Sequence, residues 1–377
     1  MKLSQISFAL LFFVGGGCAH GPSAEEVAAA KAKAEADAKA AQLAKEEAEQ
    51  QARIEEDLFG PPKSYDQLAS KFEFECPAPL YDFTQPHSVQ LGEQQFWIHG
   101  SLVEREGDID KKEWRIGVLG AIKDATEPTQ ANLKKAGALF VKEKVDFVIV
   151  NGDLADQFDD LAGVFDLLAE NFSMPLFVFP GNVDPVGGFN QNFLRVQKSK
   201  PNFFNMIWHR HLKWGKLHLF VLPGYHNKDF SQPGACIYRQ KDIDVVDGLM
   251  SEAQNMNEIF VLASHGPPLG KGKYDLDFAA GGENVGDPQL VDLVRKHNVP
   301  VGIFSHILES GGNAKTDIEN KSRQKFPMKA KVKNLYLNAG AASGMPWDLT
   351  NGKLSEGMAA IIRVHATEGV DADLIRF

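Results

Sequence analysis

Short runs of hydrophobic residues alternate with amphipathic segments over residues 113–377. Each run is bounded by Gly, Pro or polar residues, which is typical of a buried β-strand. Strands are predicted over residues 115–119, 147–150, 176–179, 217–222, 259–263, 301–304, 335–337 and 358–364. Helical spacing of the apolar positions predicts helices over residues 131–143, 159–171, 245–256 and 288–297. This alternation predicts an α/β domain whose functional loops leave the strand ends.

The first eighteen residues carry the features of an export signal. Lys2 supplies a positive charge, and the apolar run that follows, residues 6–14, is too short to span a bilayer. Three glycines then lead to Cys18, and the segment resembles a bacterial lipoprotein signal, with Gly15 where Leu is usual. That resemblance implies cleavage before Cys18, lipidation of Cys18 and attachment to the membrane of the bacterial cell envelope. Ala19 after the cysteine favours the outer membrane, and an ordinary cleaved signal peptide is the alternative.

A charged spacer is predicted over residues 19–60. Residues 24–58 are mostly Ala, Glu, Lys and Gln without Gly or Pro, and 13 of these 35 residues are Ala, the best helix former. One continuous helix of this length would extend about 50 Å. Large apolar residues are too sparse for a sustained heptad seam, so a semi-rigid spacer is preferred over a coiled coil. Residues 61–112 are predicted as lead-in strands and turns.

Composition narrows the possible classes of function. The 377 residues are 44% hydrophobic and 24% charged, as in an ordinary globular protein. The formal net charge of −10 argues against a nucleic-acid partner. Only three cysteines are present, which excludes a disulfide-rich scaffold. With Cys18 lipidated, Cys76 and Cys236 remain, either as a disulfide or as two separate thiols.

Polar side chains follow four of the predicted strands at the point where each strand ends. They are Asp153, Asn182, His265 and His306. Because the carboxyl ends of neighbouring parallel strands share one edge of a sheet, these side chains are expected to converge. An Asp, Asn, His and His set suits a divalent transition metal ion.

The order and spacing of these segments resemble the calcineurin-like metallophosphoesterase family. The resemblance extends over residues 113–345 and includes Ser264-His265-Gly266-Pro267-Pro268 and Asn338-Ala339-Gly340. It implies a four-layer α/β/β/α sandwich over residues 113–377 and a centre of two metal ions. Carried over by position, Asp153 would bridge the two ions, and Asn182, His265 and His306 would complete one ligand set, for one ion of the Mn, Fe or Zn class.

The second ligand set of the family is largely missing. By resemblance, Ala121 and Lys123 replace an aspartate and a histidine of the first motif, and Leu308 replaces the second histidine of the last motif. Val183 replaces the imidazole that in the family protonates the leaving group or steadies the phosphate. Ala, Val and Leu offer no lone pair and no proton. The ammonium of Lys123 is a candidate stand-in for the missing cation, or else it points to solvent.

Three further residues are expected to border the pocket: Asp124, Asp184 and His226. The sequence therefore predicts an envelope lipoprotein whose degenerate centre binds one metal ion or a phosphorylated ligand with little or no turnover. The alternative is an active single-metal phosphoester hydrolase using Asp153, Asn182, His265, His306 and Lys123. The partner is expected to be a phosphorylated small molecule or an envelope protein.

Overall fold

The computed structural model describes residues 24–59, 76, 86–254, 258–319 and 330–377. The chain divides into two units, residues 1–60 and residues 61–377. The described part of the first unit is the single 36-residue helix α1, Ala24–Phe59. Its described side chains are exposed, and Lys45 and Glu49 form an ion pair one turn apart. None of the helices that the structure describes has both the length and the apolar character needed to cross a bilayer.

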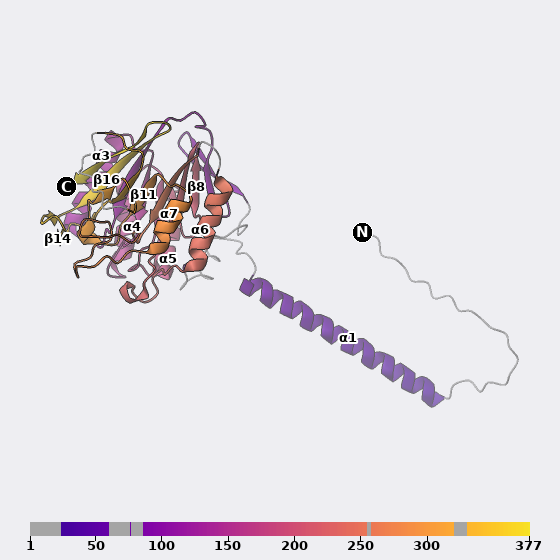
Figure 1. The fold of residues 1–377 in the computed structure, drawn as a ribbon. Helices are drawn as coiled ribbons and strands as arrows, with labels where there is room; N and C mark the ends of the chain where they lie inside the picture. The colour runs from indigo at the N-terminus through magenta and orange to yellow at the C-terminus, as the bar shows by residue number, and fades with distance from the viewer. Residues whose placement is uncertain (1–23, 60–75, 77–85, 255–257, 320–329) are drawn as a thin grey trace. The chain divides into compact units, whose positions relative to one another are not determined.

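Two stacked β-sheets form the centre of the second unit (Figure 1). The first sheet has six strands in the order β17-β16-β4-β5-β6-β7, and the second has nine in the order β1-β2-β3-β8-β9-β10-β11-β13-β12. The six-stranded sheet comprises β4 (Glu113–Gly120), β5 (Phe147–Asn151), β6 (Leu176–Phe179), β7 (Phe203–Asn205), β16 (Met358–His365) and β17 (Gly369–Arg376). The nine-stranded sheet comprises β1 (His87–Leu91), β2 (Gln94–His99), β3 (Leu102–Arg105), β8 (His211–Trp214), β9 (Leu217–Leu222), β10 (Ile259–Ser264), β11 (Val301–Phe304), β12 (Ala314–Lys315) and β13 (Leu335–Asn338). A small ribbon pairs β14 (Trp347–Asp348) with β15 (Leu354–Ser355).

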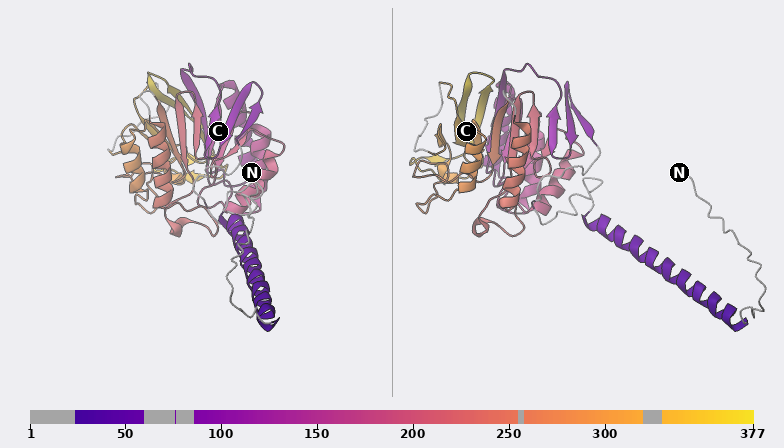
Figure 2. Two further views of the ribbon diagram at one scale, coloured as in Figure 1. Left: turned by 90° about the vertical axis from the view of Figure 1, so that its right-hand side faces the viewer. Right: turned by 45° about the vertical axis from the view of Figure 1, so that its right-hand side comes forward.

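Helices cover the outer face of each sheet (Figure 2). Apolar residues of α3 (Glu127–Lys142), α4 (Asp160–Asn171) and α5 (Val186–Gln197) share a core with the six-stranded sheet. Those of α6 (Gln240–Ala253) and α7 (Pro288–Lys296) share a core with the nine-stranded sheet. Two short 3-10 helices, η1 (Lys228–Phe230) and η2 (Leu308–Ser310), lie in loops. The second unit is therefore an α/β/β/α sandwich, the arrangement that the family resemblance implies. Its nine-stranded sheet also includes β1, β2 and β3, which precede the predicted start of the sandwich at residue 113.

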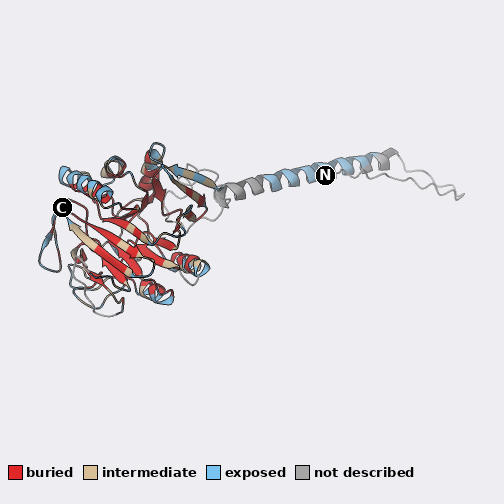
Figure 3. Cartoon of the chain, turned by 90° about the horizontal axis from the view of Figure 1, so that it is seen from above, coloured by how far each residue is buried: buried red, intermediate tan, exposed pale blue. Residues whose placement is uncertain are grey.

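A third core lies between the two sheets. The alternation of side chains along β5 shows how the layers are made: Val148 and Val150 join the helix-side core, whereas Phe147 and Ile149 join the inter-sheet core. All five residues of β5 are buried. Figure 3 shows buried strands at the centre and exposed positions on the outer sides of the helices. A strand buried on both faces has no alternation of polarity, which explains its continuous apolar run.

All eight predicted strands and four predicted helices are present. Helix α6 begins five residues earlier than its apolar pattern indicates, because Asp242 accepts a hydrogen bond from the backbone N–H of Arg239 and fixes the first turn. Helix α5 was not predicted, although Phe189, Phe193 and Val196 are buried on one of its faces. The glycines at positions 187 and 188, near the start of this helix, are typical of a loop.

The N-terminal signal, its lipidation at Cys18 and the cleavage site lie outside the described residues. The sequence leaves open whether Cys76 and Cys236 form a disulfide or remain as separate thiols. Cys76 and Cys236 form a disulfide with their Cα atoms 4.9 Å apart, across a sequence separation of 160 residues.

Candidate functional site

The candidate site lies where strands of both sheets end. Strands β4, β5 and β6 are parallel in one sheet, and β9, β10 and β11 are parallel in the other. The loops after these six strands carry Lys123, Asp153, Asn182, His226, His265 and His306. Stacking the two sheets brings these loops together at one edge of the sandwich, the usual place for a site in such folds.

Three of the predicted ligands form one cluster. Asp153, His265 and His306 each offer a ligand atom, and these atoms all lie within 4.8 Å of one another. Asp153 and His265 are fully buried, and burial together with the nearby His265 lowers the pKa of His306 to about 3. His306 is therefore neutral at pH 7 and presents a lone pair.

The orientation of His265 fixes what its ring offers to the cluster. Its Nδ1 lies 3.0 Å from the backbone carbonyl oxygen of Asn151, which can only accept, so Nδ1 donates. Its Nε2 lies 3.0 Å from Oδ1 of Asp153 and 2.9 Å from Oδ1 of Asn182. Nε2 of His265 thus faces two oxygen atoms, one from each side chain.

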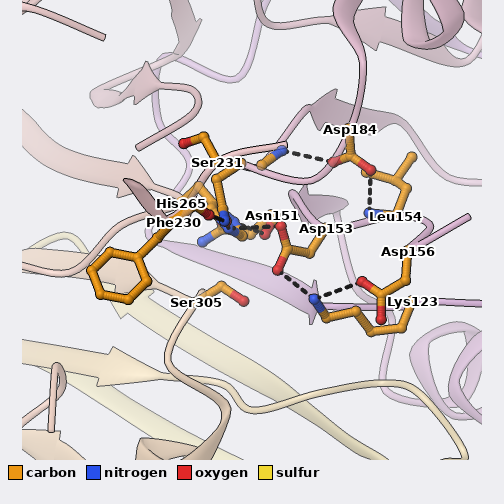
Figure 4. Close-up of polar contacts among 12 residues, drawn as sticks. Lys123, Asn151, Asp153, Leu154, Asp156, Asp184, Phe230, Ser231, His265 and Ser305 are labelled. Atoms are coloured by element: carbon orange, nitrogen blue, oxygen red, sulfur yellow. Dashed lines mark hydrogen bonds and ion pairs between the residues drawn. The ribbon is translucent and has the colours of Figure 1, made fainter. Parts of the chain in front are cut away.

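Asn182 is held by the loop that precedes α6. Its Nδ2 donates to the carbonyl oxygen of Phe230, so its Oδ1 is the atom that faces His265. Its own carbonyl oxygen accepts from the backbone N–H of Gln232, 2.9 Å away. These contacts set the amide in the orientation that a ligand oxygen requires. Figure 4 shows Phe230 and Ser231 beside His265 and Asp153.

Lys123 lies on the other side of the Asp153 carboxylate (Figure 4). Its Nζ is 2.8 Å from Oδ2 of Asp153 and 3.0 Å from Oδ1 of Asp156. Burial acts to lower the pKa of Lys123, but the two carboxylates outweigh it and raise the pKa above its ordinary value. Burial acts to raise the pKa of Asp153, whereas His265 and Lys123 hold it well below its usual range. The ammonium therefore points into the site rather than to solvent. Asp156 was not singled out in the sequence, although it lies only three residues past Asp153.

Apolar side chains occupy the remaining side of the site. Ala121 and Leu308 pack with Ala341 in a small buried cluster, and the partly buried Trp347 packs against it. Val183, beside Asn182, is half-buried. This side of the site contributes no ligand atom from these residues.

The backbone at the site is unusual. Ala121, Lys123, Asp153 and His306 are non-glycine residues with positive φ, between 44° and 71°. This left-handed conformation is costly for residues with a Cβ and is found preferentially at functional sites. Glycine is required at position 181 for lack of space, because a Cβ there would collide with Asp153 and His265.

The three residues expected to border the pocket lie in different places. Asp184 is buried beneath Asp153 and accepts from the backbone N–H groups of Leu154 and Gly181, at 2.8 Å and 2.7 Å. Burial, assisted by the charge of Asp153, raises the pKa of Asp184 to about 6. Asp124 faces α3 instead, where its Oδ1 accepts from Thr129 Oγ1 at 2.7 Å.

His226 lies next to the cluster rather than in it. The ring of Tyr225 stands between the two histidines, with its centroid 4.4 Å from that of His226 and 4.0 Å from that of His306.

The donor set fits a divalent transition metal ion. Oδ1 of Asp153 is a buried oxygen without a hydrogen bond of good geometry among the described residues, although His265 Nε2 is 3.0 Å away. Asp153, His265, His306 and Asn182 supply carboxylate, imidazole and amide atoms, the ligands such ions take in proteins. A cation here would relieve the mutual repulsion of these lone pairs.

Comparisons with known proteins point the same way as the fold. A sequence model of the family described as calcineurin-like phosphoesterase matches residues 115–310. One crystal structure covers 70% of this chain and 99% of its own chain, at 14% identity and a TM-score of 0.51. A dimetal phosphatase from Danio rerio covers 70% and 99%, at 11% identity and a TM-score of 0.44. GAP50, the anchor in the inner membrane complex of Plasmodium, covers 71% and 85%, at 15% identity and a TM-score of 0.45. The comparison with curated protein sequences gives no match.

Proposed function

The chain belongs to the calcineurin-like phosphoesterase family, and from that premise we propose that it binds one divalent metal ion and, through it, a phosphorylated ligand, with little or no turnover. The observation that carries this proposal is that the two oxygen atoms of the Asp153 carboxylate have different partners. Its Oδ1 faces His265, whereas its Oδ2 is paired with the ammonium of Lys123.

The ion would be held by Asp153, Asn182, His265 and His306. When bound, a divalent ion of the Mn, Fe or Zn class supplies Lewis acidity toward a phosphoryl oxygen. The chain's own residues orient the ligands: the Asn151 carbonyl oxygen holds the His265 ring, and Phe230 holds the Asn182 amide. A second ion at Oδ2 would have to displace a buried ammonium, and Ala121 and Leu308 would give it no ligands.

Low turnover is proposed for a chemical reason. Val183 carries no proton for a leaving group, and general acid catalysis is worth about 10²–10⁴ in rate. The alternative, an active single-metal hydrolase, is favoured by the position of Lys123, since its fixed charge at Asp153 could replace that of the missing ion.

Metal content of the purified chain tests the proposal. Elemental analysis is expected to find near one ion per chain, lost in His265→Ala and kept in the matched variant His99→Ala, whose side chain is exposed on β2. Two ions per chain, or none, would contradict it. Hydrolysis of aryl phosphate mono- and diesters, with Asp153→Ala as control, separates the two candidates, because robust turnover that disappears in the control favours the hydrolase.

We also propose that the chain is a lipid-anchored envelope protein, with α1 as its spacer. The resemblance of residues 1–18 to a lipoprotein signal supports this, as does the Cys76–Cys236 disulfide, since such bonds persist in oxidising compartments. Membrane fractionation of the wild type and of Cys18→Ala is the test. Equal membrane association of the two would contradict lipidation.

A further inference from the structure

The loop after β9 is joined to both sides of the ligand cluster. The backbone N–H of Gly224 donates to the carbonyl oxygen of Pro180, 3.0 Å away, at the start of the loop that carries Asn182. The next residue, Tyr225, packs its ring against His306, and a Cβ at Gly266 would collide with that ring. His226 therefore has a fixed place next to Tyr225, whose ring contacts both His226 and His306.

The His226 ring packs against two aromatic side chains. Its centroid lies 4.4 Å from that of Tyr225 and 6.2 Å from that of Tyr238. Its Nδ1 is buried without a hydrogen-bond partner in the part of the chain that the structure describes. A buried polar atom left unpaired lowers stability, so hydrogen bonding at Nδ1 does not account for the place of this ring.

Three other donors around the cluster already have acceptors. The Lys123 ammonium is paired with Asp153 and Asp156, the Asn182 amide donates to Phe230, and Nδ1 of His265 donates to Asn151. Burial lowers the pKa of His226, against the opposing effect of Asp287, so the ring is neutral at pH 7 and carries one N–H. Because Nδ1 is buried, Nε2 is the nitrogen that would carry the N–H toward a ligand.

We propose that His226 donates a hydrogen bond to an oxygen of the phosphate group whose other oxygens approach the ion. This inference rests on the proposed function and makes it more specific. It assigns anion recognition to the loop after β9, and it leaves the ion itself to Asp153, Asn182, His265 and His306. The ligand class is then a phosphate or phosphate ester with one oxygen free to reach this loop.

The test uses calorimetric titration of the purified full chain, first with Mn²⁺ and then with inorganic phosphate in the presence and absence of Mn²⁺. The variants are His226→Ala, the conservative His226→Asn and the exposed control His99→Ala. We expect the Mn²⁺ affinity to be unchanged in all three. Phosphate binding to the Mn²⁺-loaded protein is expected to weaken about tenfold in His226→Ala, the effect of losing one hydrogen bond to a charged group, with partial recovery in His226→Asn.

The outcomes separate this inference from the proposed function. If wild type and His226→Ala bind phosphate with equal affinity, the proposed role of His226 is wrong, whether Mn²⁺ is present or absent. It is also wrong if the Mn²⁺-loaded wild type binds no phosphate. A parallel loss of Mn²⁺ affinity overturns it as well, because His226 would then hold the ion. A wild type that takes up no ion refutes the proposed function, and the titrations without Mn²⁺ then decide the role of His226.

Discussion

The Nζ atom of Lys123 lies 2.8 Å from Oδ2 of Asp153, and both side chains are buried. The other oxygen of the same carboxylate lies 3.0 Å from His265 Nε2. One carboxylate is thus shared between a fixed ammonium and the cluster of Asp153, His265 and His306. We expect both the stability and the metal content of the protein to depend on this pair.

Lys123→Met is expected to destabilise the protein. It leaves Oδ2 of Asp153 buried without its cation, and removing one partner of a buried ion pair costs about 3 kcal/mol or more. Denaturant unfolding of the ion-free protein measures this loss. Lys134→Met on the exposed face of α3 is the control and should stay within about 0.5 kcal/mol of wild type. Equal stability of Lys123→Met and wild type would show that the pair carries no net stabilisation.

A triple variant, Ala121→Asp, Lys123→His and Leu308→His, is expected to raise the metal content from near one ion per chain to near two. The substitutions replace apolar atoms and an ammonium with ligand atoms on the unused side of Asp153. Asp tolerates the left-handed backbone at position 121 (φ 44°) better than Ala does. Elemental analysis gives the count. If the folded triple variant still binds one ion, these three side chains are not the reason that a second ion is not bound.

Removing the disulfide by the paired change Cys76→Ser and Cys236→Ser is expected to lower both stability and ion affinity. A native disulfide closing a long loop contributes about 2–4 kcal/mol. The carbonyl oxygen of Cys236 also accepts from the N–H of Tyr225, beside His306. Thermal unfolding and Mn²⁺ titration are measured together. A lower melting temperature with unchanged Mn²⁺ affinity would restrict the disulfide to a role in stability.

Stability is expected to fall as the pH is lowered from about 7 toward 4. Burial lowers the pKa of His209 to about 4, with a smaller contribution from His87, although its Nδ1 is 2.6 Å from the carbonyl oxygen of Gly100. The unfolded chain, with a histidine pKa near 6.5, binds the proton first, so acid favours unfolding. His211 and His218 have pKa values lowered to about 3 and 4 by burial, and they act in the same direction.

Melting temperatures between pH 7.5 and 5 measure this dependence. His209→Asn cannot take up the proton and should show a shallower decline, with lower stability at pH 7.5. An identical slope in wild type and His209→Asn would exclude His209 as a cause.

The α/β class followed from local patterns. A continuous apolar run such as β5 has to be covered on both faces, and helical segments between such runs provide the cover, so an α/β domain was predictable. The positions of Asp153, Asn182, His265 and His306 at strand ends were predictable for the same reason. The α/β/β/α order of the layers came from the family resemblance. The glycine pair at the start of α5 concealed a helix, because the packing that stabilises it comes from Phe165 and Trp208, far away in the sequence.

The sequence by itself determined which chemical groups are available: four polar side chains at strand ends, and Ala, Val and Leu where the resemblance would place further polar side chains. Only the tertiary structure decided how they are used. It pairs Lys123 with Asp153 and Asp156, joins Cys76 to Cys236 and turns Asp124 toward α3. Among the described residues it leaves Nδ1 of His226 buried without a hydrogen-bond partner. Strand identity is a local property of hydrophobic pattern, whereas the direction of a polar side chain depends on partners from distant segments, which meet only when the two sheets stack.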